Sequence, residues 1–367
     1  MSDLCELVAG HIRSIAPYQP GKPISELERE LGLTRIIKLA SNENPLGPSP
    51  KALEAIRAAL PELALYPDGN GFELKSALAR RFALTREQVV LGNGSNDVLE
   101  LAARTFLGPG TSAVYSEHAF TVYPLVTQAV GATGIEVPAR DFAHDLDALV
   151  AAIRPDTRIL FVANPNNPTG SLIAGPALRA ALERVPSHVL IVLDEAYTEY
   201  LEPAQRYDAV SWLAHLPNLL ISRTFSKAYG LAGLRVGFGL ARPAVIDLMN
   251  RVRQPFNVSS LALVAARAAL DDQEFLERTR VLNSAGLVQL AEGFRRLGLP
   301  FIPSHGNFLS VEVGESARVY QSLLHQGIIV RPVAGYRMPR HLRISVGLPE
   351  ENAACLAALE RALREAA

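Results

Sequence analysis

Residues Ser222–Phe238 read S-R-T-F-S-K-A-Y-G-L-A-G-L-R-V-G-F and carry the strongest fold signal in the chain. The apolar run just before them is typical of a buried strand. Lys227 follows two hydroxyl residues, Thr224 and Ser226, and the glycine-rich run after it reaches Arg235. A lysine in this setting can hold an aldehyde cofactor as a Schiff base while hydroxyls and a guanidinium hold the phosphate of that cofactor. The alternative is a surface lysine in a turn.

The sequence around this stretch alternates between short apolar runs and helical or loop-rich segments. Fully apolar strands separated by helices predict an α/β fold with a mostly parallel central sheet covered by helices on both faces. In such sheets ligands bind at the carboxyl ends of the strands. The predicted strands are Ser112–Tyr115, Arg158–Ala163, Val189–Asp194, Leu219–Ser222 and Val236–Leu240.

Three parts are expected along the chain. Residues 48–241 form a large cofactor-binding domain, and residues 242–367 form a smaller α+β domain. The smaller domain is indicated by a long helical stretch, Asp271–Leu297, and by three strand-like runs and an Ala/Leu/Glu-rich helix after it. Residues 1–47 are expected to be an N-terminal arm that joins the smaller domain.

Composition excludes several function classes. The 367 residues are 49% hydrophobic with a net charge of −1, which does not indicate binding to nucleic acid or to an anionic membrane. No apolar run approaches the roughly 20 residues of a membrane span. The cysteines, Cys5 and Cys355, lie far apart, and the 8 histidines form no ligand pattern. A cytoplasmic protein without a metal is therefore expected.

Polar residues follow several of the predicted strands. Asp194 ends a strongly apolar run, where a carboxylate indicates a function, and Tyr197 stands three residues further on. Asn167 lies in the turn-rich segment N-P-N-N-P-T-G. Asp194 could instead cap a helix, and the other segments could be ordinary loops. A glycine turn that opens a helix, and so offers backbone amides to an anion, holds Gly94, Ser95 and Asn96.

These segments together resemble the motifs of the fold-type I aminotransferases, which depend on pyridoxal 5′-phosphate. The resemblance implies that Lys227 carries this cofactor and acts as general base and acid. It also implies that Asp194 keeps the ring nitrogen protonated and therefore has a low pKa. Tyr197 and Asn167 would bind the phenolic oxygen of the cofactor. The implied phosphate site comprises Gly94, Ser95, Asn96, Thr224, Ser226 and Arg235.

The same resemblance assigns three further residues. Phe120, in H-A-F-T-V-Y, takes the position of an aromatic ring that stacks on the cofactor, although it could also be a core residue. Tyr66, in L-Y-P-D-G, matches a tyrosine that reaches the phosphate from the partner subunit, which implies a homodimer. Arg343, in an apolar strand, matches the arginine that binds the substrate carboxylate.

Within this family the chain most resembles the histidinol-phosphate aminotransferases. The match lies in Pro17-Tyr18, in K-L-A-S-N-E-N-P-L-G from Lys38, in N-R-V-R-Q-P-F-N-V from Asn250 and in G-I-I-V-R-P from Gly327. It implies that Tyr18 and Arg331 face the substrate phosphate and that Asn44 lies near the substrate. Some relatives have a tyrosine at the position of Phe256, so one phosphate contact is in doubt.

The implied reaction transfers an amino group from L-histidinol phosphate to 2-oxoglutarate, giving imidazole-acetol phosphate and L-glutamate in histidine biosynthesis, by a ping-pong mechanism. Three alternatives stay open. An aromatic amino acid aminotransferase would have the same fold and would also need Arg343. A decarboxylase of a phosphorylated amino acid would break a different bond at the same carbon. A cofactor-binding regulator would need an attached helix-turn-helix domain, which the sequence does not indicate.

Overall fold

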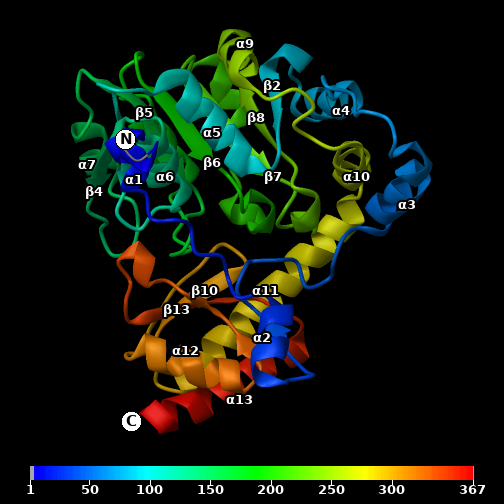
Figure 1. Ribbon diagram of the computed structural model, residues 1–367, viewed down its shortest axis with the longest axis vertical. Coiled ribbons are helices and arrows are strands. Elements are labelled where there is room, and N and C mark those ends of the chain that lie inside the picture. The colour runs from blue at the N-terminus through cyan, green and yellow to red at the C-terminus, as the bar shows by residue number, and fades with distance from the viewer. Residues whose placement is uncertain (1–3, 367) are drawn as a thin grey trace.

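The computed structural model describes residues 4–366 and shows a larger and a smaller body, with the long helix α11 (Gln273–Arg296) running from one to the other (Figure 1). The larger body is built on a seven-stranded sheet with the order β2-β8-β7-β6-β5-β3-β4. Only β8 runs antiparallel to its neighbours, which confirms the predicted mostly parallel α/β fold. The strands are β2 (Val89–Gly92), β3 (Ser112–Ser116), β4 (Thr133–Val137), β5 (Thr157–Ala163), β6 (Leu190–Asp194), β7 (Leu219–Thr224) and β8 (Gly237–Ala241).

The central strands are apolar throughout because both faces of the sheet are covered. Side chains alternate between faces along a strand. In β6, Ile191 and Leu193 enter one hydrophobic cluster, whereas Leu190 and Val192 enter another on the opposite face. The first face is covered by α3 (Pro50–Ala59), α4 (Phe72–Phe82), α7 (Leu146–Ala151), α8 (Gly175–Leu182) and α10 (Ser260–Leu270), and the second by α5 (Ser95–Phe106), α6 (Val122–Ala129) and α9 (Pro243–Val252).

The smaller body combines an antiparallel sheet with helices from both ends of the chain. Its four strands have the order β12-β13-β10-β9, and α11, α12 and α13 pack around its core. A separate pair of short parallel strands joins β1 to β11. The elements are β1 (Ile37–Lys38), β9 (Phe301–Ile302), β10 (Phe308–Glu312), β11 (Ile328–Ile329), β12 (Arg331–Pro332), β13 (His341–Ser345), α12 (Ser316–His325) and α13 (Pro349–Ala366).

One domain boundary and one strand differ from the sequence prediction. Helices α9 and α10 were assigned to the smaller domain, but their apolar faces pack into the two clusters of the larger body. We therefore place the transition between the bodies within α11 and not at residue 241. Strand β4 was not predicted because four of its five residues are not fully buried, as expected for the edge of a sheet.

The N-terminal segment contacts both bodies. Helix α1 (Gly10–Arg13) lies on α6 of the larger body, where Gln128 Nε2 donates hydrogen bonds to the His11 carbonyl and to Ser14 Oγ. Helix α2 (Ile24–Leu31) packs on the smaller body through Leu27. The arm was expected to join the smaller domain, and the structure adds a contact between α1 and the larger body. No helix within residues 4–366 is long and apolar enough to cross a membrane.

Candidate active site

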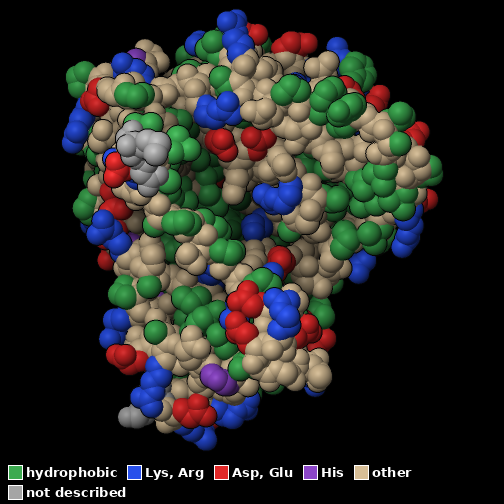
Figure 2. All heavy atoms as spheres, viewed as in Figure 1, with side chains coloured by type: hydrophobic (Ala, Val, Ile, Leu, Met, Phe, Trp, Pro, Cys, Tyr) green, Lys and Arg blue, Asp and Glu red, His purple; other side chains and the backbone are tan. Residues whose placement is uncertain are grey.

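A cavity of about 210 Å³ lies between the two bodies, at the carboxyl ends of the central strands. The space-filling view shows a hollow at this position with basic side chains in it (Figure 2). The cavity brings together most of the residues that the sequence predicts for the site. These are Tyr18, Ser95, Asn96, Phe120, Asn167, Asp194, Tyr197, Thr224, Ser226, Lys227, Arg235, Arg331 and Arg343.

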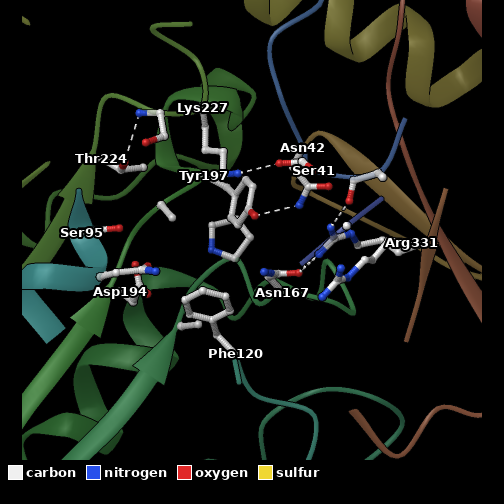
Figure 3. A pocket seen from close by; sticks show the side chains of 18 of the residues that line it. Ser41, Asn42, Ser95, Phe120, Asn167, Asp194, Tyr197, Thr224, Lys227 and Arg331 are labelled. Carbon is white, nitrogen blue, oxygen red and sulfur yellow. Dashed lines mark hydrogen bonds between the residues drawn. The ribbon is translucent and has the colours of Figure 1, made fainter. Parts of the chain in front are cut away.

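Lys227 enters the cavity from the loop that follows β7 (Figure 3). Its Nζ atom donates a hydrogen bond of 2.9 Å to the Ser41 carbonyl. Burial and, to a smaller extent, the positive charge of Arg343 lower the pKa of Lys227 to about 7. A lysine with this pKa exists partly as the neutral amine near neutral pH, which is the form that reacts as a nucleophile or accepts a proton.

Asp194 stands at the end of β6 and is buried. Tyr123 Oη donates a hydrogen bond of 2.9 Å to Oδ2, whereas Oδ1 has no hydrogen-bond partner in the described part of the chain. Burial raises the pKa of Asp194 to about 6, and the hydrogen bond from Tyr123 opposes this rise. The low pKa expected from the sequence is therefore not a property of the chain's own groups. It would require a cationic donor at Oδ1.

Hydrogen bonds connect the residues on the opposite wall. Asn42 Nδ2 donates to Tyr197 Oη at 2.9 Å. Arg343 Nη1 donates to Asn167 Oδ1 at 2.5 Å, and Nη2 donates to the Ala40 carbonyl at 2.7 Å. Burial raises the pKa of Tyr197 to about 12, so its phenol stays protonated at neutral pH. These contacts hold the phenol of Tyr197, the amide of Asn167 and the guanidinium of Arg343 at the same cavity.

A cradle for an anion lies at the start of α5. Arg235 Nη1 donates to Ser226 Oγ at 3.2 Å, and the Ser226 amide donates to Thr224 Oγ1 at 3.0 Å. Gly94 does not line the cavity itself, but a Cβ atom there would lie 2.4 Å from Arg235 Nη2. Its φ of +82° also favours glycine. The side chain of Arg235 can therefore approach the N-terminus of α5 only because residue 94 has no side chain.

Arg331 and Tyr18 form the outer part of the wall. Arg331 Nη2 donates to the Gln19 carbonyl at 2.7 Å and to Tyr18 Oη at 3.3 Å, and its guanidinium lies 5.5 Å from the centre of the Tyr18 ring. In the β12–β13 ladder Arg331 is the direct partner of Arg343. Side chains of directly paired residues lie on the same face of a sheet. Both guanidinium groups consequently line the same cavity.

Besides Gly94, three predicted site residues lie outside the cavity lining. Asn44 is buried and donates hydrogen bonds to the Ala228 carbonyl at 2.9 Å and to Thr279 Oγ1 at 3.0 Å. Asn44 therefore does not line the cavity, and its expected position near the substrate stays a prediction. Tyr66 is 83% exposed, and its ring stacks on that of Phe256 at 4.9 Å. A single chain therefore leaves Tyr66 and Phe256 on its outer surface.

Sequence reasoning missed several cavity residues, among them the polar side chains of Asn42, Tyr123 and Tyr336. Asn42 stands in the same S-N-E-N-P segment as Asn44, and its φ of +55° marks the turn that points it inward. Tyr123 lies three residues after Phe120, a helical spacing that could have indicated a shared face. No sequence signal singled out Tyr336.

The donor set fits pyridoxal 5′-phosphate. A buried carboxylate oxygen without a partner suits a protonated ring nitrogen, and the lowered pKa of Lys227 suits attachment to an aldehyde. The cradle at Gly94 and Arg235 suits a phosphate. Residues 4–366 contain no group of three or more His, Cys, Asp or Glu side chains that could hold a metal ion.

Comparisons with known proteins agree with this geometry. The family model for aminotransferase class I and II matches residues 34–359. A histidinol-phosphate aminotransferase of Methylobacillus flagellatus is 63% identical over 99% of both chains. A second, from Nitrosospira multiformis, is 60% identical over 98% of this chain and 93% of its own.

A solved structure extends the agreement to three dimensions. The histidinol-phosphate aminotransferase of Sinorhizobium meliloti in complex with pyridoxal-5′-phosphate superposes with a TM-score of 0.91, at 30% identity over 98% of both chains. The fit of the cavity and this relative together identify pyridoxal 5′-phosphate as the cofactor. The chain belongs to the histidinol-phosphate aminotransferases, within the class I and II aminotransferase family.

Proposed function

We propose that the chain transfers the amino group of L-histidinol phosphate to 2-oxoglutarate, giving imidazole-acetol phosphate and L-glutamate by a ping-pong mechanism. The observation that carries this proposal is the pairing of Arg331 with Arg343 on one wall of the cavity. Histidinol phosphate carries a phosphate and no carboxylate, whereas glutamate carries two carboxylates. Two guanidinium groups at different depths offer a charge-assisted contact to either substrate.

Bound pyridoxal phosphate supplies an electron sink for the charge left on the substrate carbon when its proton is removed. Lys227 is the base that removes this proton, since a pKa of about 7 leaves a large neutral fraction at neutral pH. The same Nζ atom would then hold the proton and donate it again on the cofactor side of the substrate. Its hydrogen bond to the Ser41 carbonyl keeps the amine directed into the cavity between the two positions.

Other cavity residues would orient the cofactor. We assign Asp194 Oδ1 to the ring nitrogen, Tyr197 and Asn167 to the phenolic oxygen, and Phe120 to the ring face. The unpartnered oxygen of Asp194 and the protonated phenol of Tyr197 support the first two assignments. Phosphate binding is assigned to the cradle formed by Gly94, Ser95, Asn96, Thr224, Ser226 and Arg235.

We also propose a homodimer in which Tyr66 of each subunit completes the phosphate site of the other. Tyr66 and Phe256 lie outside the cavity of their own chain, on a surface that also exposes Leu63, Leu65 and Phe72. Exposed apolar residues gathered in this way are typical of an interface. A cytoplasmic location stays a prediction from composition.

The test compares two amino donors. Arg331→Ala removes a charge-assisted contact worth about 1.5–3 kcal/mol, so kcat/KM for histidinol phosphate should fall roughly 10- to 150-fold. The value for L-phenylalanine, which has no phosphate, should change much less. Arg337→Ala is the matched control, because Arg337 pairs with Glu136 outside the cavity and should affect neither donor.

Equal losses for both donors would remove Arg331 from the phosphate site. A wild-type preference for phenylalanine would instead favour the aromatic amino acid aminotransferase. Release of carbon dioxide would identify a decarboxylase. Lys227→Ala should lose both the visible absorption band of the bound cofactor and nearly all turnover.

A further inference from the structure

A buried tyrosine stands directly behind the carboxylate of Asp194. Tyr123 belongs to α6, is fully buried, and reaches Asp194 Oδ2 with its hydroxyl at 2.9 Å. It is one of the residues that line the cavity. The resemblance from which the other site residues were assigned gave it no role.

Aromatic packing fixes the direction of the Tyr123 hydroxyl. Its ring stacks on Phe161 with centroids 4.7 Å apart and an interplanar angle of 5°. Its edge meets the ring of Phe120 at 5.9 Å and 87°. The phenol therefore has neighbours on its face and its edge, and the same ring supports Phe120, which we assign to the face of the cofactor. The ring is held in place, and only the hydroxyl hydrogen can rotate, about the C–O bond.

The two oxygens of Asp194 differ because of this tyrosine. Oδ2 accepts the hydrogen bond from Tyr123, whereas Oδ1 has no partner among residues 4–366 and belongs to a side chain that lines the cavity. A carboxylate held at one oxygen cannot rotate without losing that bond. The unpartnered oxygen is thus kept available to a ligand.

We propose that Tyr123 is a positioning residue that acts through Asp194: it holds one carboxylate oxygen, keeps the carboxylate ionised by donating to it, and directs the other oxygen at the ring nitrogen of the cofactor. This inference rests on the role proposed above for Asp194. The residue touches the carboxylate and not the reacting atoms.

Burial and the charges around Tyr123 and Asp194 determine whether the Tyr123 hydroxyl stays protonated. Burial raises the pKa of Asp194, and the hydrogen bonds from Tyr123 and from the Ala196 backbone lower it. The charge of Glu195 adds a smaller rise, and that of Lys227 opposes it. Burial and Asp194 raise the pKa of Tyr123 itself well above its usual value, with smaller effects from Tyr197 and Tyr336. Tyr123 therefore remains a donor at every pH at which the enzyme works.

Removal of the Tyr123 hydroxyl should lower the protonated fraction of the cofactor's ring nitrogen. Without the donor the carboxylate becomes more basic and takes a larger share of the proton that it holds in common with the ring nitrogen. The ring then carries less positive charge. A less positive ring raises the pKa of the nitrogen that joins Lys227 to the cofactor, because less charge repels the second proton.

The test is a pH titration of the visible absorption band of the holoenzyme. Tyr123→Phe should raise its midpoint by about one pH unit, since part of the effect of a lost hydrogen bond to a charged group is relayed to the cofactor. The nitrogen NMR signal of isotope-labelled cofactor should move toward the unprotonated position. Turnover should fall through kcat, with little change in KM.

Two further variants keep the test decisive. Tyr115→Phe removes the same hydroxyl from another tyrosine of the same hydrophobic cluster that does not line the cavity, and should leave the midpoint unchanged. A ring-fluorinated tyrosine at position 123 keeps the shape but is a stronger donor. It should move the midpoint down, even if Tyr123→Phe folds poorly.

A midpoint that is the same in wild type, Tyr123→Phe and the fluorinated protein would overturn the inference. An equal shift in Tyr115→Phe would also overturn it, because it would show a general packing effect. A wild-type protein without any visible band would instead refute the proposed function, so the two failures are distinguishable.

Discussion

The buried ion pair between Arg223 and Glu195 allows a quantitative test of how the site is held. Glu195 follows Asp194 at the end of β6, and Arg223 precedes Thr224 in β7. Arg223 Nη2 lies 2.7 Å from Glu195 Oε2, with the glutamate side chain 0% exposed. The pair therefore joins the two strand ends that carry the proposed partners of the cofactor ring and phosphate.

The perturbation is Arg223→Met, which removes the cation and keeps an unbranched side chain. Glu195 is then a buried carboxylate without its partner, and breaking a buried pair in this way costs about 3–5 kcal/mol. The guanidinium also lies 5.0 Å from the centre of the Phe82 ring, a contact worth about 0.5–1 kcal/mol. Adding Glu195→Leu removes the stranded charge, so the double variant should recover most of the loss.

The assay is urea unfolding of wild type, both single variants and the double variant, without cofactor and at one protein concentration. Equal m-values would show that the free energies of unfolding can be compared. Arg179→Met is the control, because its pair with Glu183 is exposed on α8 and should contribute less than about 1 kcal/mol. The reasoning is refuted if Arg223→Met costs less than about 1 kcal/mol, or if the double variant is as unstable as Arg223→Met alone.

Three further predictions concern protonation and the asparagines. The single-turnover rate with amino donor should rise with pH through about 7, where Lys227 loses its proton, and Arg343→Gln should move that midpoint up; a flat profile would contradict the role of Lys227 as base. Burial raises the pKa of Glu199 to about 7, so the folded form holds a proton that the unfolded form releases near its usual pKa of 4.5, and stability should fall as pH rises between these values. Glu199→Gln should make that fall smaller in urea unfolding, and identical pH profiles for wild type and Glu199→Gln would refute the assignment. Asn42→Ala should lower kcat by roughly tenfold because the hydrogen bond to Tyr197 is lost. Asn44→Ala should lower the free energy of unfolding by about 1–3 kcal/mol and leave the turnover of folded enzyme nearly unchanged. The reverse pattern would contradict the structure.

The sheet could be predicted because its central strands bury both faces. Each residue of β6 is buried, so the run V-L-I-V-L-D could be interpreted without knowing its neighbours. Strand β4 has mixed polarity because it is an edge strand, and nothing local distinguishes it from a loop. Helices α9 and α10 follow the last strand of the large sheet, and only their packing partners reveal that they return to it.

Site residues could be predicted where a sequence motif identifies the chemical group. They could not be predicted where the backbone of a turn decides which way a side chain points. Asp194 ends β6 and Lys227 lies in the loop after β7, and the cavity forms at the carboxyl ends of these strands, so the position of both residues followed from topology. Asn42 and Asn44 differ by two residues in one segment, and the left-handed backbone at Asn42 decides which of them faces inward. The hydroxyl of Tyr123 depends on contacts between α6 and two strands, which no short segment contains.

The pairing of β1 with β11 has a consequence for the order of assembly on the ribosome. Ile37 lies beside Ile328, and Leu27 packs among residues near Leu324, so the smaller body is made from both ends of the chain. Every strand of the seven-stranded sheet has been synthesised once Ala241 has been added to the chain. Domains generally fold as units as the chain grows, at about 5–20 residues per second. Helix α2 and strand β1 must therefore wait for residues 324–329 before they can dock, and the wall of the cavity that holds Arg331 and Arg343 forms only after β12 and β13 have been synthesised.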